Sequence, residues 1–204
     1  MIVKICGMKT EGAALAAEAA GADLLGFIFY KGSRRYVAPE IVKEISTGIR
    51  HSKRVGVFVD APLSEVNEIA EFCSLDYVQL HGHEDEAYAR RVARPVIKAY
   101  RYGDNFNADE AGHYPAEIIL LDSFVKGEAG GTGKTFAWQE ASREVASLGK
   151  PLLVAGGISE ENLSEVAETF HPYGVDVSGS LEEQGEKSVR LITSFLREAE
   201  RWRG

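Results

Sequence analysis

Two residues that can exchange protons stand at the ends of apolar runs far apart in the chain. Cys6 closes the run Ile2–Cys6, and Asp122 follows the apolar residues 118–121. A thiolate can act as a base and a protonated carboxyl group as an acid, so the pair suits a proton-transfer reaction that needs no metal or cofactor. Each residue also has a structural interpretation, because a cysteine at a strand end is often a small buried hydrophobe and an aspartate there can begin a turn.

Glycine and serine follow two later apolar runs. Backbone N–H groups in such segments can approach a phosphate closely, because glycine has no side chain to hold the ligand away. The alternative is that these glycines only make tight turns between strands and helices. The residues that we predict to bind phosphate are Gly156, Gly157, Ser178, Gly179 and Ser180.

Eight short apolar runs recur along the chain. They are rich in Val, Ile, Leu and Phe, and several lack polar alternation, which is typical of parallel strands covered on both faces. The predicted strands are Ile2–Cys6, Asp23–Phe29, Arg54–Val59, Tyr77–Leu80, Pro95–Ala99, Glu117–Asp122, Leu152–Ala155 and Val175–Ser178.

Helical patterns fill the segments between these runs. They predict helices at Thr10–Ala20, Pro39–Ile49, Leu63–Phe72, Asp85–Val92, Trp138–Ser147, Glu161–Phe170 and Lys187–Arg201, and a short one at Asp109–His113. This alternation within 204 residues predicts one domain, residues 1–204, folded as a (β/α)8 (TIM) barrel. An open doubly wound sheet is the alternative. In a barrel the C-terminal strand ends share one rim, which would gather Cys6, Asp122 and the glycine segments.

Composition narrows the possible partners and location. The net charge of −8 argues against nucleic acid, whose phosphates are bound by an excess of Lys and Arg. The apolar runs are far shorter than the ~20 residues of a membrane helix, and two cysteines are too few for a disulfide framework. We therefore expect a cytoplasmic protein, without a membrane or nucleic-acid partner, as a monomer or homodimer.

Two further motifs resemble ligand sites. The segment Gly130–Lys134 is similar to a nucleotide-binding P-loop, but Glu128 stands where that motif needs glycine, so we interpret it as a mobile loop beside the substrate. His81 and His83 lack a third ligand of suitable spacing, so we expect no metal site. We expect His81 to form a polar wall of the pocket, His83 to be solvated, and Cys73 to pack within a helix face.

Taken together, strings of residues along almost the whole chain resemble phosphoribosylanthranilate isomerase. The strings are Lys4–Met8, Gly26–Tyr30, Ser33–Tyr36, Val55–Val59, Val78–Gly82, Leu120–Asp122, Gly130–Trp138, Ala155–Gly157 and Gly174–Ser178. The chain departs from the family after the last run: it has Ser178-Gly179-Ser180 where Ser-Ser-Gly is more frequent, and Ser188 where Asp is usual. Ala137 also replaces a common Asp.

The resemblance implies a β/α barrel that performs an Amadori rearrangement in tryptophan biosynthesis. The substrate would be the phosphosugar N-(5-phosphoribosyl)anthranilate and the product 1-(2-carboxyphenylamino)-1-deoxyribulose 5-phosphate, with no cofactor. By the resemblance, Cys6 is the general base, Asp122 the general acid, and Arg35 a contact of the anthranilate. Gln79, His81 and Asp176 are further expected substrate contacts, and Asp122 needs a pKa raised by burial.

The general base needs a thiol pKa below its usual value of about 8.5. Lys4 lies two residues before Cys6 and so shares its face of the strand. We hypothesise that Lys4 favours the Cys6 thiolate, directly or through Asp176. The alternative is a Lys4–Asp176 ion pair in the barrel core with no catalytic part.

Two other functions compete with this interpretation. A related barrel isomerase of the histidine pathway would share the chemistry, but it shows a two-fold internal repeat and a carboxylate in place of Cys6, and this chain has neither. A non-catalytic barrel that binds phosphate ligands would show binding without turnover.

Overall fold

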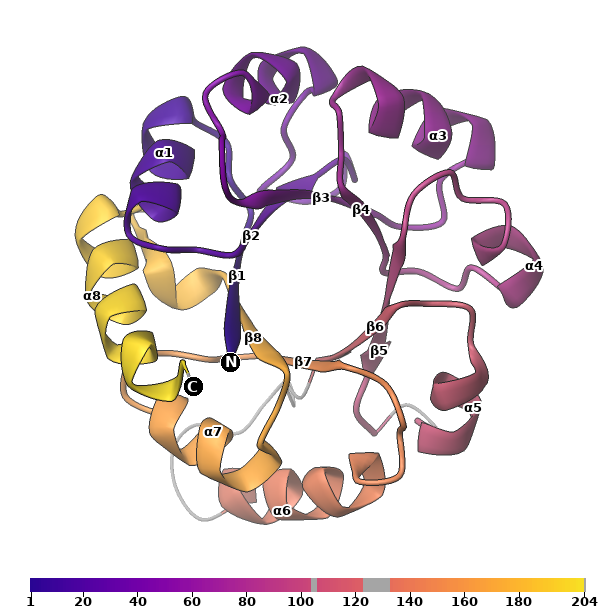
Figure 1. The fold of residues 1–204 in the computed structure, drawn as a ribbon, viewed down its shortest axis with the longest axis vertical. Coiled ribbons are helices and arrows are strands. Elements are labelled where there is room, and N and C mark those ends of the chain that lie inside the picture. The colour runs from indigo at the N-terminus through magenta and orange to yellow at the C-terminus, as the bar shows by residue number, and fades with distance from the viewer. Residues whose placement is uncertain (104–105, 123–132, 204) are drawn as a thin grey trace.

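Eight parallel strands form a closed barrel (Figure 1). The computed structural model describes residues 1–103, 106–122 and 133–203, with the backbone alone for residues 133–137. The strands are β1 Ile2–Cys6, β2 Leu24–Ile28, β3 Lys53–Phe58, β4 Tyr77–Leu80, β5 Val96–Arg101, β6 Ile118–Asp122, β7 Leu152–Ala155 and β8 Gly174–Val177. The pairing of β8 with β1 closes the ring, so the predicted (β/α)8 barrel is confirmed and the open sheet is wrong.

Helices surround the barrel on its outside, one after each strand (Figure 1). They are α1 Glu11–Ala19, α2 Pro39–Ser46, α3 Leu63–Phe72, α4 Glu86–Ala89, α5 Ala108–His113, α6 Gly133–Val145, α7 Leu163–Phe170 and α8 Val189–Ala199. Their starts follow local chemistry: the side chains of Thr10, Asp85, Asn107 and Ser188 accept backbone N–H groups of α1, α4, α5 and α8.

Several predicted helices differ in extent from those in the structure. The helix predicted at Trp138–Ser147 begins at Gly133, and the one predicted at Pro39–Ile49 ends at Ser46. The helix expected over Asp85–Val92 is only the single turn α4, Glu86–Ala89. The helix expected over Lys187–Arg201 begins two residues later, because Lys187 belongs to a small hairpin. In that hairpin β9, Glu182–Glu183, pairs with β10, Glu186–Lys187. A short 3-10 turn, η1 Gly179–Leu181, connects β8 to it.

The barrel interior is apolar at the start of the strands and polar at their ends. Its apolar cluster contains Leu24, Val55, Ile97, Ala99, Ile118, Leu120, Leu153 and Ala155, with Ile2 and Tyr77 packed against it. Side chains alternate along a strand, so the residues that follow these at intervals of two also point inward. On β1 they are Lys4 and Cys6, on β4 Gln79, and on β6 Asp122.

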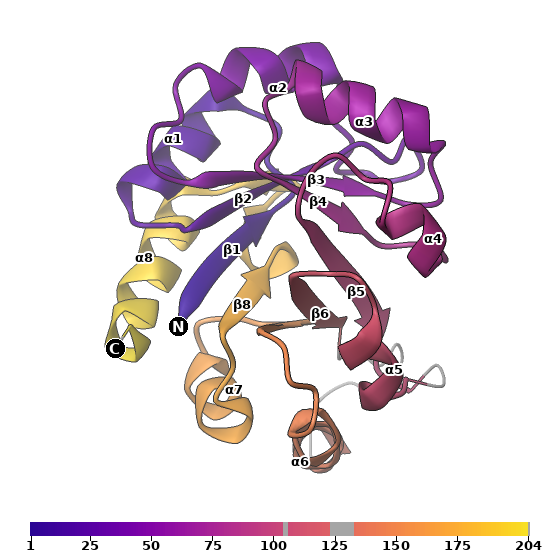
Figure 2. The ribbon, with the colours of Figure 1, turned by 45° about the vertical axis from the view of Figure 1, so that its right-hand side comes forward.

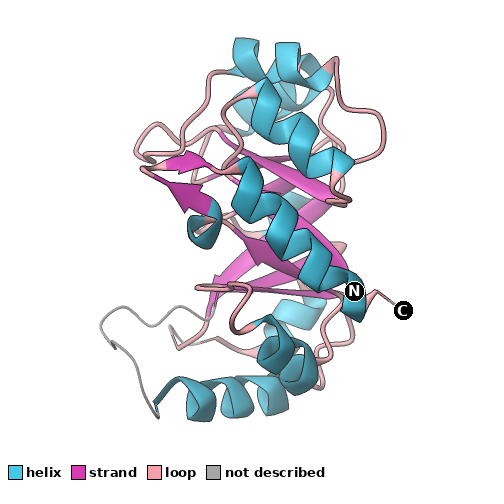
Figure 3. Cartoon of the chain, turned by 90° about the vertical axis from the view of Figure 1, so that its left-hand side faces the viewer, coloured by secondary structure: helices cyan, strands magenta, loops and turns pink. Residues whose placement is uncertain are grey.

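The larger apolar core is formed by residues of the strands and of the surrounding helices. The side view shows these helices packed along the outside of the strands (Figure 3). The two chain ends lie together beside the barrel (Figure 2), where the Met1 amino group donates to the Trp202 carbonyl oxygen at 3.0 Å. Trp202 is the last residue of a second short 3-10 turn, η2 Glu200–Trp202. Among the described residues, no helix combines the length and the apolar character that crossing a membrane requires.

Candidate active site

Cys6 and Asp122 lie at the C-terminal ends of strands β1 and β6, on one rim of the barrel. Around the ring, β8 and β7 separate the two strands, so the thiol and the carboxyl group face the mouth from different walls. Cys6 is buried, with 7% of its surface exposed, and Asp122 is half-buried. The arrangement offers two proton-exchanging groups on either side of one opening.

Lys4 and Asp176 form an ion pair inside the barrel. They are direct neighbours in the β1–β8 register, and the Lys4 Nζ lies 2.9 Å from the Asp176 Oδ1. The Lys4 side chain is 0% exposed. Burial would lower the Lys4 pKa, but the charges of Asp176 and then Cys6 raise it, and the pKa is raised on balance. Lys4 therefore remains a cation beneath the rim. The predicted Lys4–Asp176 ion pair in the barrel core is confirmed, and whether the pair takes part in catalysis stays a prediction.

The pKa of the Cys6 thiol is raised rather than lowered. Burial is the largest cause, and the negative charge of Asp176 adds to it. Lys4 opposes both, through its charge and a side-chain hydrogen bond, and Lys187 opposes them from further away. The expectation of a lowered thiol pKa is therefore wrong for this structure, because burial outweighs the cations. The direct influence of Lys4 has the expected direction, whereas Asp176 acts against the thiolate.

Glycines on both sides make room for Cys6 and its neighbour. A Cβ atom at Gly26, the β2 partner of Cys6, would lie 2.8 Å from the Cys6 Sγ and 3.1 Å from the Lys4 Nζ. Gly7 has a φ of +86°, and a Cβ there would lie 2.6 Å from the Arg35 Cδ. Any larger residue at Gly26 would displace the thiol, and one at Gly7 would displace Arg35.

Gln79 and His81 lie along the inner wall formed by β4. The Gln79 Nε2 lies 2.9 Å from the His81 Nδ1, and Gln79 is almost fully buried. Burial lowers the His81 pKa, although the charge of Asp122 opposes this change. His81 is therefore neutral at neutral pH. If its Nδ1 accepts from the Gln79 amide, its Nε2 carries the proton as a donor; this tautomer is assigned from the hydrogen bond.

The predicted phosphate residues lie on two loops that hydrogen bonds tie together. The Ser180 hydroxyl donates to the Ile158 carbonyl oxygen at 2.5 Å, which joins the loop after β8 to the loop after β7. The Ser178 hydroxyl donates to the Cys6 carbonyl oxygen at 2.9 Å. Gly156 and Gly157 have φ angles of +92° and +72°, which only glycine adopts readily. Both hydroxyls thus donate to backbone carbonyl oxygens, and that these loops bind phosphate stays a prediction.

Arg35 reaches the same rim from the loop after β2. Its Nε lies 2.5 Å and its Nη2 3.2 Å from the two carboxylate oxygens of Glu182. Burial would raise the Glu182 pKa, but hydrogen bonds from Arg35 and Lys187 and their charges lower it to about 2. Glu182 is thus an ionised, buried partner of Arg35. Glu182 was not predicted from the sequence as a site residue.

Comparisons with known proteins identify the family. The family model for N-(5'phosphoribosyl)anthranilate (PRA) isomerase matches residues 3–198. The chain belongs to this family. The N-(5'-phosphoribosyl)anthranilate isomerase of Geobacter sulfurreducens is 43% identical over 202 residues, with 98% of each chain covered. That of Desulforamulus reducens is 42% identical over 196 residues, covering 96% of this chain and 93% of the relative. The chain is accordingly an isomerase of tryptophan biosynthesis.

Solved structures of the same family share the barrel. The phosphoribosyl anthranilate isomerase of Thermus thermophilus is 36% identical, with a TM-score of 0.86 and 100% of both chains covered. A phosphoribosyl anthranilate isomerase in complex with reduced 1-(o-carboxyphenylamino)-1-deoxyribulose 5-phosphate is 32% identical, with a TM-score of 0.86, covering 98% of this chain and 100% of the other. The recognition of the family from its sequence motifs is confirmed.

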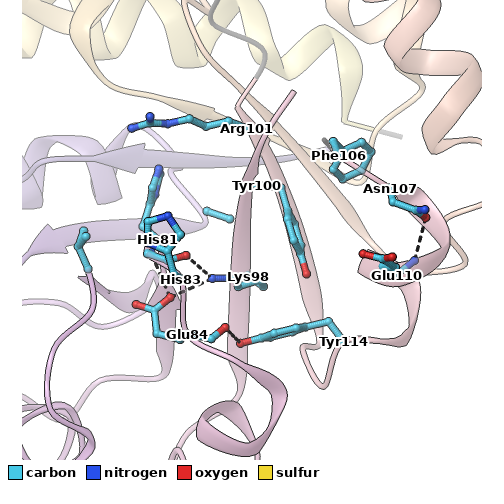
Figure 4. A pocket seen from close by; sticks show the side chains of 13 residues that line it. His81, His83, Glu84, Lys98, Tyr100, Arg101, Phe106, Asn107, Glu110 and Tyr114 are labelled. Carbon is cyan, nitrogen blue, oxygen red and sulfur yellow. Dashed lines mark hydrogen bonds and ion pairs between the residues drawn. The ribbon is translucent and has the colours of Figure 1, made fainter. Parts of the chain in front are cut away.

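A cavity of about 510 Å³ lies beside the mouth, between the segments after β4 and β5 (Figure 4). His81 and Arg101 line it on the side of the barrel, and Phe106 and Tyr114 line it on the side of α5. Arg101, which ends β5 next to Asp122 in the register, was not predicted as a site residue. Its positive charge adds to the lowering of the His81 pKa, which places it close to the predicted wall of the pocket.

The other residues singled out from the sequence lie away from the rim or outside the described part of the chain. The His83 side chain is exposed, as expected, and Cys73 packs with its Sγ 3.3 Å from the Pro39 carbonyl oxygen. The segment Gly130–Lys134 lies outside the residues whose side chains are described. Within the described part, no group of three His, Cys, Asp or Glu residues is placed to hold a metal ion.

Proposed function

We propose that Cys6 and Asp122 catalyse the conversion of N-(5'-phosphoribosyl)anthranilate into 1-(2-carboxyphenylamino)-1-deoxyribulose 5-phosphate, the third step of tryptophan synthesis from chorismate. The observation that carries the proposal is the position of both groups on one rim of a barrel of this family, on different walls of its mouth. A ligand in the mouth can then meet an acid on one side and a base on the other.

The first step opens the ribose ring. Asp122, in its protonated form, gives its proton to the ring oxygen while the bond between that oxygen and C1 breaks. The lone pair of the anthranilate nitrogen forms the C1=N bond, which yields a cationic iminium. The substrate nitrogen thus serves as the electron acceptor for the next step, and no cofactor takes part in either step.

The second step removes the proton from C2. The Cys6 thiolate takes this proton, the C–H electrons form a C1=C2 bond, and the iminium becomes a neutral enol-amine. The enol-amine becomes the ketone when C1 gains a proton and the C2 hydroxyl loses one. Since burial raises the thiol pKa, the cations Lys4 and Lys187 are the groups that favour the reactive thiolate.

The remaining rim residues bind the two ends of the substrate. The backbone of Gly156, Gly157, Ser178, Gly179 and Ser180 takes the phosphate, supported by the hydrogen bonds that join these loops to each other and to Cys6. Arg35 takes the anthranilate carboxylate, as a planar guanidinium suits a carboxylate. Gln79, His81 and Asp176 contact the sugar from the inner wall, where the structure buries or half-buries all three.

Loss of the substrate's fluorescence tests the proposed reaction. Phosphoribosylanthranilate is generated in the cuvette and the purified protein is then added, with the Asp122→Asn variant as a matched control. We expect rapid loss of fluorescence with the wild-type protein only. If a high concentration of wild-type protein leaves the fluorescence unchanged, the proposal is wrong, and binding of the substrate without turnover would instead support a non-catalytic barrel.

The proposal includes the setting in which the enzyme works. We take residues 1–204 as one catalytic domain whose partner is a small phosphosugar, acting in the cytoplasm as a monomer or homodimer. Both cysteines are free thiols, which fits a reducing compartment. A phosphoribosylanthranilate isomerase from Thermotoga maritima, 30% identical with a TM-score of 0.83, is a dimeric enzyme whose structure was solved as generated monomers. Light scattering on the purified chain separates the two states.

A further inference from the structure

The hairpin after β8 places one carboxylate among three cations. Glu182, the first residue of β9, has a side chain that is only 6% exposed. It accepts hydrogen bonds from Arg34 Nη2 at 2.9 Å and from Lys187 Nζ at 2.9 Å, in addition to its two bonds from Arg35. With three positive charges around one negative charge, the cluster keeps an excess of two positive charges for a ligand that carries both a phosphate and a carboxylate.

The position of Arg35 depends on this carboxylate. Glu182 binds the edge of the guanidinium formed by Nε and Nη2, which leaves the edge with Nη1 turned away from Glu182. The Arg35 side chain runs across Gly7, and a Cβ atom at Gly179 would lie 3.3 Å from its Nη2. The guanidinium is therefore held between the end of β1, which carries Cys6, and the turn after β8.

Lys187 connects the same carboxylate to the phosphate turn. Its Nζ donates to the Ser178 carbonyl oxygen at 2.9 Å as well as to Glu182, and its side chain is 3% exposed. Ser178 in turn donates to the Cys6 carbonyl oxygen. Burial lowers the Lys187 pKa, and the hydrogen bond and charge of Glu182 oppose that change. Without Glu182, the cation that orients this turn would lose its counter-charge.

We propose that Glu182 is a positioning residue that holds Arg35 and the Ser178–Ser180 turn at one fixed separation. The inference rests on the proposed function, because it assumes that Arg35 meets the anthranilate carboxylate and the turn meets the phosphate. A rigid pair of anion sites recognises a ligand by the distance between its two charges. Glu182 thereby selects a substrate that presents a carboxylate and a phosphate together.

The test compares two neighbouring glutamates on the hairpin. Glu182→Gln keeps the size of the side chain and removes its charge. Glu183→Gln is the matched control, because Glu183 is 52% exposed and pairs outward with Arg190. We expect Glu182→Gln to raise KM about ten-fold with a smaller change in kcat, since it loosens charged hydrogen bonds to the binding groups. Glu183→Gln should leave both constants within about two-fold.

A double-substitution cycle separates positioning from a general effect on the fold. If Glu182 acts through Arg35, then Glu182→Gln should raise KM much less in an Arg35→Ala background, to below about three-fold. Equal effects of Glu182→Gln in both backgrounds would contradict the link to Arg35. Inhibition by inorganic phosphate reports the other end, and we expect Glu182→Gln to weaken it and Glu183→Gln to leave it unchanged.

The outcomes distinguish this inference from the proposed function. If the wild-type protein does not turn over phosphoribosylanthranilate, the proposed function fails. If it does, and Glu182→Gln has the KM of Glu183→Gln, the inference alone is overturned. Should Glu182→Gln not fold, Glu182→Asp keeps the charge but shortens the reach by one methylene, and the same rise of KM, coupled to Arg35, is expected. An unchanged KM in Glu182→Asp would then reject the inference.

Discussion

Two barrel strands, β1 and β5, carry a buried lysine that lies 2.9 Å from a carboxylate, Lys4 and Lys98, and the surroundings of the two lysines differ. Lys98 points outward from β5 and donates to Glu84 and to the Gly82 carbonyl oxygen. Glu84 also accepts the backbone N–H groups of Asp60 and Gly82, so hydrogen bonds join this pair to the segments after β3 and β4. Figure 4 shows Lys98 and Glu84 facing each other. Lys4 points inward and shares its charge between Asp176 and the Cys6 thiol.

The two ion pairs differ in what lies next to the lysine. Lys98 lies beside groups that hold the structure, whereas Lys4 lies beside the proposed catalytic thiol of Cys6. Lys98 donates to the Glu84 carboxylate and to the Gly82 carbonyl oxygen, and its Nζ also lies over the rings of Tyr100 and Tyr114. Lys4 has a counter-charge that raises the pKa of Cys6, while Lys4 itself lowers it. In the proposed reaction the inner pair therefore sets the pKa of the base Cys6, whereas the outer pair holds the segment after β4 in place.

Among these predictions, the largest effect on kcat is expected for a substitution of Asp122, the proposed general acid. Asp122→Asn removes the proton donor, and kcat should fall by at least about 100-fold, because a placed acid contributes about 10²–10⁴ in rate. The fold should persist, since the amide has the size of the carboxyl group. Steady-state kinetics with circular dichroism as a control checks this, and near-normal kcat would remove Asp122 from the mechanism.

Lys4→Met breaks the inner pair. It leaves Cys6 beside Asp176 without a counter-charge, so the thiol pKa should rise further and kcat at neutral pH should fall about ten-fold. Titration of the thiolate absorbance measures the pKa, in a Cys73→Ala background so that Cys6 is the only thiol. If Cys6 titrates as in the parent protein, Lys4 has no electrostatic role in catalysis.

The pH dependence of the wild-type rate tests whether the pKa of Cys6 is raised. The thiolate is the active form, and a raised pKa moves its formation to higher pH. The rate limb that reports Cys6 should therefore rise with pH and continue above the usual thiol value of about 8.5. Lys4 stays charged over this range because its own pKa is also raised. A limb that levels off below about pH 8.5 would contradict a raised thiol pKa.

Lys98→Met breaks the outer pair, and its effect on turnover should be the smallest. It leaves Glu84 buried without its cation, which should cost about 3–5 kcal/mol of unfolding free energy. The kcat of the folded fraction should stay within about two-fold of wild type. Urea denaturation and kinetics measure the two quantities separately. If the pKa of Cys6 also shifts in Lys98→Met, the claim that, of the two ion pairs, only Lys4–Asp176 influences the thiol is wrong.

The sequence was sufficient to predict the parts of the molecule that follow simple periodicity. Apolar runs located the strands, and strand ends located the rim with Cys6 and Asp122. The alternation of side chains, together with closure of the barrel, also placed Lys4 beside Asp176. These inferences need only a period of two residues and one shared rim.

Two features could not be predicted from the sequence: the contacts made by irregular segments, and pKa shifts that depend on the balance between burial and nearby charges. The Glu182 cluster is built by strands of two residues, too short for any periodic pattern, and Lys187 therefore looked like the start of a helix. A long gap between Arg35 and Glu182 in the chain hides their contact. The direction of the Cys6 pKa shift depends on burial outweighing two cations, and residue types alone do not supply that balance.

Single-turnover kinetics of Cys6→Ala tests the central claim most directly. With enzyme in excess over phosphoribosylanthranilate, substrate loss reports the chemical steps without product release. We predict that Cys6→Ala consumes the substrate at least about 100-fold more slowly than wild type, although it still binds the substrate and retains its fold. A single-turnover rate close to that of wild type would show that Cys6 is not the base.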